Sequence, residues 1–235
     1  MKEYAAFDAM GLAELVRTGE VSSKELLDEA VSRANTAQGD LNCFSALYPD
    51  LAEAQLADLP KEGPFAGVPF ITKDLGVMIK GAPLTNGSVS WKGHVAAQDS
   101  TLTERFRKAG LVMFGQTTSP EFGLTTTTES TLYGQTRNPW DVTRTSGGSS
   151  GGASAAVAAG VVPLAQASDG GGSIRIPAAC TGLFGMKPSR GRTPMGPFQT
   201  EGWNGMSTVH AVSRTVRDNA ALLDAPHGRE TGSRY

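Results

Sequence analysis

Two tracts rich in glycine and serine contain residues whose types and spacing could do chemistry. The first, TSGGSSGGASAAVAAG at 145–160, places glycines on both sides of Ser149 and Ser150. The second, ASDGGGSIRIPAACTG, places three glycines directly before Ser173. Consecutive glycines let backbone N–H groups converge on one point without side chains in the way. The second tract therefore suits an oxyanion hole, and a glycine turn with an exposed serine is the alternative.

The first tract is compatible with a flexible linker, a phosphate loop or a turn that carries a catalytic serine. No Lys or Arg follows the glycines at 147–152 as a phosphate loop requires, and GxGxxG is missing from both tracts. The nucleophile-elbow pattern GxSxG occurs around Ser149 and again around Ser150, but polar turn residues precede it where an elbow needs a strand. Only His210 and His227 follow as partners for such an elbow.

Periodic apolar patterns predict the elements that must position these residues. Two helices are expected over 11–37, with Ser22 or Ser23 as the cap of the second. Further along the chain the patterns predict a buried strand from 65 to near Lys73, a helix at 100–110 followed at once by a strand, a helix at 153–159, a strand at 161–167 and a helix at 213–224. This alternation predicts an α/β fold, a mixed sheet covered by helices on both faces. Ligands bind at the carboxyl ends of such strands, so Lys73 is expected at that edge.

Length and charge limit the classes of protein. A chain of 235 residues is expected to form a single domain over 1–235, with a helical N-terminal region at 1–60. The 21 Lys and Arg nearly balance the 23 Asp and Glu, which argues against nucleic acid or an anionic membrane as a partner. Charges interrupt the N-terminal stretch and no apolar run is long enough to span a bilayer, so we expect a soluble, cytoplasmic protein.

Cysteine and histidine are too sparse to predict a metal site or a disulfide framework. Cys43 and Cys180 have no metal-ligand spacing, and His94, His210 and His227 stand far apart. We expect no metal and no cofactor. We expect the histidines to be surface or loop residues, Cys180 to lie in the core, and Ser150 and Ser154 to cap or pack the helix that they begin.

Several motifs together resemble the amidase signature family. GGSSGGASAAVAAG is followed by SDGGGSIRIPAACTGLFGMKPSRGR, and GVPFITKDL lies upstream, in the family's order and spacing. The likeness extends over nearly the whole chain, including VSSKELLDEAVSR, GLVMFGQTTSPEFG and GQTRNPWD. Features near TSPEFG and in the last forty residues are more similar to stand-alone hydrolases of aryl acylamides and nylon oligomers than to tRNA-dependent amidotransferases.

The resemblance implies a role for particular residues. The family's lysine falls on Lys73, its bridging serine on Ser149 and its acylated serine on Ser173. The family's oxyanion donors fall on the backbone N–H groups of Gly170, Gly171, Gly172 and Ser173. Asp169 and Arg175 match positions that support this loop. The implied activity is hydrolysis of a small-molecule carboxylic acid amide through an acyl-enzyme, with no cofactor.

The chemistry implied by the resemblance sets a physical condition on Lys73. A lysine can accept a proton only when it is neutral, and burial is what lowers its pKa from about 10.4. Lys73 follows a buried apolar strand and could meet that condition, although a solvated charge at the strand end is the ordinary alternative. Ser149 would then relay a proton from Ser173 to Lys73.

The resemblance covers only the N-terminal half of the family's usual length. Three explanations stay open: a fragment of a longer protein, a short member completed by self-association as a homo-oligomer, or an inactive homologue that binds or scaffolds. The amidase-like component of a glutamine-dependent tRNA amidotransferase is a further alternative.

Overall fold

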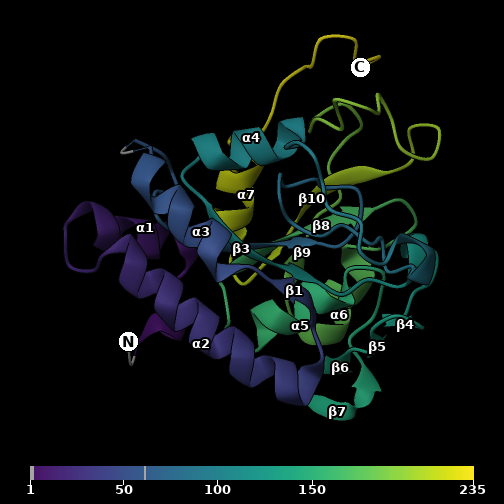
Figure 1. Cartoon of the computed structure of the whole chain (residues 1–235), viewed down its shortest axis with the longest axis horizontal. Helices are drawn as coiled ribbons and strands as arrows, with labels where there is room; N and C mark the ends of the chain where they lie inside the picture. Colours follow the sequence, from purple (N-terminus) through teal and green to yellow (C-terminus); the bar gives the residue numbers. More distant parts are fainter. Residues whose placement is uncertain (1–2, 61) are drawn as a thin grey trace.

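The computed structural model of the chain describes residues 3–60 and 62–235. Most of its strands lie in the middle of the molecule, with α4 and α7 on one side and α2, α5 and α6 on the other, whereas the short strands β4 to β7 lie at one edge (Figure 1). The helices are η1 (Tyr4–Ala6), α1 (Ala9–Arg17), α2 (Ser23–Leu41), α3 (Pro49–Gln55), η2 (Leu56–Asp58), η3 (Val89–Trp91), α4 (Thr101–Lys108), η4 (Glu121–Gly123), α5 (Gly151–Ala158), α6 (Arg175–Thr181) and α7 (Val216–Asp224). Within the described ranges, none of them is long and apolar enough to cross a membrane.

The strands form two three-stranded sheets and two short hairpins. They are β1 (Phe44–Leu47), β2 (Pro69–Lys73), β3 (Val112–Thr117), β4 (Glu129–Ser130), β5 (Gly134–Gln135), β6 (Arg137–Asn138), β7 (Asp141–Thr145), β8 (Leu164–Asp169), β9 (Phe184–Gly185) and β10 (Thr208–Ser213). The first sheet has the order β1-β3-β2, with β1 antiparallel and β2 parallel to β3. The second has the order β8-β10-β9, and its neighbours are antiparallel.

The two sheets meet where β2 lies beside β8. A side chain links the two strands at this seam. The backbone N–H of Lys73 donates to Oε1 of Gln166 at 2.7 Å. Both residues are fully buried. A backbone N–H that is buried needs a partner, and the amide of Gln166 provides one across the seam.

The expected α/β class is confirmed, and most of the expected elements are present. Ser22 caps α2 with a capping box, and Ser100 caps α4. The helix expected at 153–159 begins two residues earlier, and the strand expected at 161–167 is β8, which begins and ends later. The strands β1 and β10 were not predicted. The expected mixed sheet corresponds to the first sheet, and the second sheet is antiparallel throughout.

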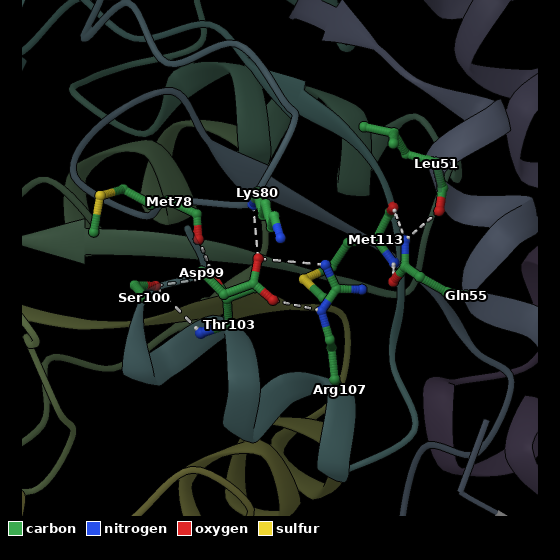
Figure 2. Close-up of polar contacts among 9 residues, drawn as sticks. All are labelled: Leu51, Gln55, Met78, Lys80, Asp99, Ser100, Thr103, Arg107 and Met113. Atoms are coloured by element: carbon green, nitrogen blue, oxygen red, sulfur yellow. Dashed lines mark hydrogen bonds and ion pairs between the residues drawn. The ribbon is translucent and has the colours of Figure 1, made fainter. Parts of the chain in front are cut away.

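Polar contacts fix the beginning of α4, which borders the candidate site described below. Asp99 accepts from the backbone N–H of Lys80 at 2.7 Å and from Nε of Arg107 at 2.8 Å (Figure 2). The side-chain amide of Gln55 pairs with both backbone groups of Met113 on β3, at a position beyond the end of β1 (Figure 2). The first set of contacts holds α4 to the segment of Lys80, and the second holds α3 to β3.

Glycines in the first tract allow α5 to pack directly on neighbouring backbone. A Cβ at Gly152 would lie 2.6 Å from the amide nitrogen of Thr118 and 2.7 Å from the carbonyl oxygen of Cys43. Both distances are shorter than real Cβ contacts, and backbone cannot move aside as a flexible side chain can. The glycine at this position is therefore required by packing and not by flexibility.

We expect Gly152→Ala to lower the free energy of unfolding by about 1–3 kcal/mol, the usual cost of overpacking. Gly39→Ala is the matched control, because Gly39 lies inside α2 and a Cβ there meets nothing within 4 Å. That change should be neutral or should stabilise by about 0.5–1 kcal/mol, since alanine favours helix. Urea unfolding monitored by circular dichroism measures both, and equal effects of the two substitutions would contradict the packing argument.

Candidate active site

Lys73, the last residue of β2, is fully buried and points at two hydroxyl groups. Its Nζ lies 2.7 Å from Oγ of Ser149 and 3.2 Å from Oγ of Ser168. The strand that carries it is buried along its whole length. The alternative of a solvated charge at the strand end is therefore wrong.

Burial lowers the pKa of Lys73 to about 7, and the nearby carboxylate of Asp169 opposes that shift. Burial disfavours the charged ammonium because the site cannot solvate it as water does. A substantial fraction of the lysine is therefore uncharged near neutral pH. A neutral amine that contacts a hydroxyl has the state and the position needed to accept a proton.

Ser149 and Ser173 lie on separate turns that contact each other. Ser149 precedes α5 and follows a cis peptide bond from Gly148, and Ser173 lies between β8 and α6. The turns are joined because the backbone N–H of Ser150 donates to the carbonyl oxygen of Ser173 at 3.2 Å. The structure thus brings Lys73, Ser149 and Ser173 to one place from three distant parts of the sequence.

Asp169 organises the turn that carries Ser173. Its carboxylate accepts backbone N–H groups from Gly172 at 2.7 Å and Ile174 at 3.1 Å. The guanidinium of Arg175 donates to both carboxylate oxygens, at 2.9 and 3.0 Å. Although burial raises the pKa of Asp169, these hydrogen bonds, that from Arg175 foremost, outweigh burial and lower it to about 2. The supporting role expected of Asp169 and Arg175 agrees with these contacts.

The three glycines before Ser173 have different environments. The N–H of Gly172 donates to the carboxylate of Asp169 and is occupied by that hydrogen bond. Gly170 lines the cavity beside Ser173. The candidate oxyanion donors are therefore reduced to the amides of Gly170, Gly171 and Ser173.

A cavity of about 600 Å³ opens next to these residues. Ser149, Ser168, Gly170 and Ser173 contribute to its lining. Apolar side chains from loops, from η3 and η4, from the start of α4 and from β10 also line it: Leu75, Val77, Trp91, Leu102, Phe122, Met195, Trp203 and Val209. The lining also includes polar side chains, those of Asn86, Ser100, Gln199, Glu201 and Ser207. The cavity is of ordinary size for a small-molecule site.

Two residues that contact Lys73 were not predicted. Ser168 and Gln166 lie two positions apart on β8, so their side chains share one face of the strand. Polar residues at alternate positions of an otherwise apolar buried strand were the available signal. No group of His, Cys, Asp and Glu suited to a metal ion occurs among residues 3–60 and 62–235.

Two expectations about single residues were wrong. His210 is buried on β10 and not at the surface, with Nε2 2.7 Å from Oδ1 of Asn219; burial lowers its pKa. Cys180 is exposed on α6 and not in the core.

For Ser150, capping or packing of α5 was expected. It is fully buried before α5, and its hydroxyl donates to the carbonyl oxygen of Ser168 at 3.3 Å and does not cap the helix.

The fold agrees with the comparisons to known proteins. The amidase family model matches residues 25–234, and the chain belongs to the amidase signature family. The 6-aminohexanoate-cyclic-dimer hydrolase of Paenarthrobacter ureafaciens is 41% identical over 232 residues, which are 97% of this chain and 47% of that protein. The chain thus spans about half the length of the curated relatives it matches.

Solved structures of relatives have the same fold over the same span. A 6-aminohexanoate cyclic dimer hydrolase in complex with its substrate superposes with a TM-score of 0.94 at 40% identity, covering 98% of this chain and 48% of that one. A bacterial aryl acylamidase of the amidase signature family superposes with a TM-score of 0.88 at 35% identity, covering 96% and 48%. The expected resemblance to the N-terminal half of the family is confirmed.

The buried amine of Lys73 should make stability depend on pH in a defined window. Its pKa is about 7 in the folded chain and about 10.4 when unfolded. Between these values the unfolded chain binds more protons, so the free energy of unfolding should rise with pH, by at most about 1.4 kcal/mol per pH unit. Lys73→Met should lack this contribution. Urea unfolding at about pH 7.5 and about pH 9.5 measures it, and an unchanged difference between variant and parent would contradict a depressed pKa.

Proposed function

We propose that this chain carries the catalytic centre of an amidase that hydrolyses a non-peptide carboxylic acid amide through an acyl-enzyme. Ser173 is the nucleophile, Ser149 relays the proton and Lys73 accepts it. The observation that supports this most directly is the contact with Ser149 at 2.7 Å of a buried lysine whose pKa is lowered to about 7. The chain spans about half the length of its relatives, and the activity is proposed from the residues that it contains.

The first half of the reaction forms the acyl-enzyme. Oγ of Ser173 attacks the amide carbonyl carbon while its proton passes to Oγ of Ser149, whose own proton passes to Nζ of Lys73. The carbonyl oxygen becomes an oxyanion that the amides of the glycine turn stabilise. The C–N bond then breaks, and the departing amine takes a proton back along the same path.

The second half releases the acid. Water attacks the ester on Ser173 and gives its proton to the relay, and the tetrahedral intermediate collapses with return of a proton to Oγ of Ser173. The products are a carboxylic acid and an amine, and the enzyme is regenerated without a cofactor. Loss of one oxyanion donor costs on the order of 3 kcal/mol in the barrier in other acyl-transfer enzymes.

A fluorophosphonate that reacts with activated serines tests the proposed nucleophile. We expect covalent labelling of the parent chain at Ser173, none in Ser173→Ala, and at least about 100-fold slower labelling in Lys73→Ala, the usual size of a general-base contribution. Intact-mass measurement and peptide mapping report the site. His210→Gln should label at the parent rate, because the ring of His210 contacts Asn219 and not the serines.

Other outcomes identify the alternatives. A folded chain that never labels would indicate an inactive homologue that binds or scaffolds. Labelling that depends on His210 and not on Lys73 would indicate a histidine-based triad. Turnover only with a partner protein and a glutamine donor would indicate an amidotransferase component.

The pH dependence of activity tests the lysine as the base. The pKa of Lys73 is about 7, and only the neutral amine accepts a proton. We therefore expect kcat/KM for an anilide substrate to rise as pH increases through about 7 and to level off above it, because this profile reports groups of the free enzyme. A profile that is flat between about pH 6 and about pH 8 would contradict the assignment.

A further inference from the structure

The lining of the cavity contains a tryptophan that lies against the glycine turn. A Cβ at Gly170 would lie only 2.9 Å from the Trp203 ring, so the indole packs directly over this glycine. Trp203 lines the same cavity as Ser173 and is about half exposed, at 49%. Its ring therefore borders the space next to the proposed nucleophile.

The backbone around Trp203 forms a closed turn that holds the ring in place. Trp203, Asn204 and Gly205 all have positive φ, at 50°, 51° and 77°. The turn is closed by the N–H of Met206 donating to the carbonyl oxygen of Trp203 at 3.1 Å, and by Ser207 donating to Gly202 at 3.0 Å. Positive φ is unfavourable for residues with a Cβ and persists where the surroundings enforce it.

Contacts from distant parts of the chain anchor the segment of residues 194–207, which carries Trp203 and several other residues of the lining. Glu230 accepts the backbone N–H groups of Met195 at 2.9 Å and Gly196 at 2.8 Å. The N–H of Thr101, the first residue of α4, donates to the carbonyl oxygen of Gly196 at 3.1 Å. The segment is thus held at Met195 and Gly196 by distant residues and at Trp203 by its own closed turn.

The charges that line the cavity limit what it can hold. Among the described residues, Glu201 is the one charged side chain in the lining, and it is already paired with Arg234 at 2.9 Å and with the hydroxyl of Tyr235 at 2.7 Å. No lysine or arginine of the described lining faces the cavity to bind a carboxylate. An uncharged apolar group gains from burial against the indole, whereas a charged group would lose its hydration there.

We infer that Trp203 is a specificity-determining residue that selects amides carrying an uncharged alkyl or aryl group next to the reacting carbonyl. This inference rests on the proposed function and names the substrate class of the same site. Trp203 forms the apolar surface on which that group lies, beside the glycine turn that receives the carbonyl oxygen. The anchoring of residues 194–207 keeps this surface in place before substrate binds.

Hydrolysis of acetanilide, hexananilide and the monoanilide of adipic acid tests the inference. The native protein should prefer hexananilide to the other two, because the adipic compound carries a carboxylate at the end of a similar chain. Trp203→Ala should lower kcat/KM for hexananilide by about 10-fold or more, the scale of lost apolar pocket contacts, and change acetanilide less. Trp203→Phe should lie between. Phe198→Ala is the matched control, because Phe198 lies in the same segment at 72% exposure and does not line the cavity.

A binding arm separates this inference from the proposed function. In Ser173→Ala, calorimetry measures the affinity for hexananilide without turnover, and adding Trp203→Ala or Trp203→Phe to that background should weaken it. If the Trp203 substitutions weaken binding but the parent hydrolyses none of the anilides, the apolar subsite is supported and the proposed function is contradicted. Parent hydrolysis with equal effects of Trp203→Ala and Trp203→Phe on all three anilides, or unchanged affinity in the binding arm, would overturn the inference.

Discussion

The burial of one amine is the physical constraint on which the rest of this structure depends. An isolated ammonium in a dry interior is strongly unfavourable, so a buried lysine tends to give up its proton. Lys73 is held at the end of β2 between the hydroxyls of Ser149 and Ser168, and the charge of Asp169 opposes its neutralisation. Asp169 is in turn occupied by Arg175 and by backbone amides, which limits its pull on the amine.

The glycines near the site let backbone segments approach each other closely, and this close packing keeps the amine of Lys73 buried. Gly148 lies against the backbone of Thr127, and a Cβ there would collide with it. Gly152 lies in the same way against the backbone of Thr118 and Cys43. The tract that reads as a flexible linker by composition is therefore densely packed. The same residue type has another use at Gly170, where the absence of a side chain admits the ring of Trp203.

The sequence predicted the parts of the fold that depend on local patterns. The capped helix α2 and the apolar strands β2 and β3 follow from periodicity and capping. The strand β10 was missed because Thr208, His210 and Ser213 are polar residues, although all three are buried in this strand, which pairs with β8. His210 and Cys180 were misplaced for the same reason, since burial of a polar residue or exposure of a cysteine depends on tertiary neighbours.

The candidate site was predicted in part. Family motifs pointed to Lys73, Ser149 and Ser173, and the structure gathers these residues around one cavity or its edge. The contacts of Lys73 with Ser168 and Gln166 join segments more than ninety positions apart. The part of the lining around Trp203 comes from an irregular loop. Such contacts leave no periodic pattern in a single sequence.

The contact between β2 and β8, where the two sheets meet, determines the surroundings of the Lys73 amine. Lys73 belongs to the first sheet, whereas Ser173 lies on a turn that leaves the second, and Gln166 joins the two at the lysine itself. The hydroxyl of Ser168, which contacts the amine, also comes from the second sheet. Burial of the amine beside the serines therefore requires that the two sheets have packed against each other, and in the proposed mechanism that packing would also activate the nucleophile.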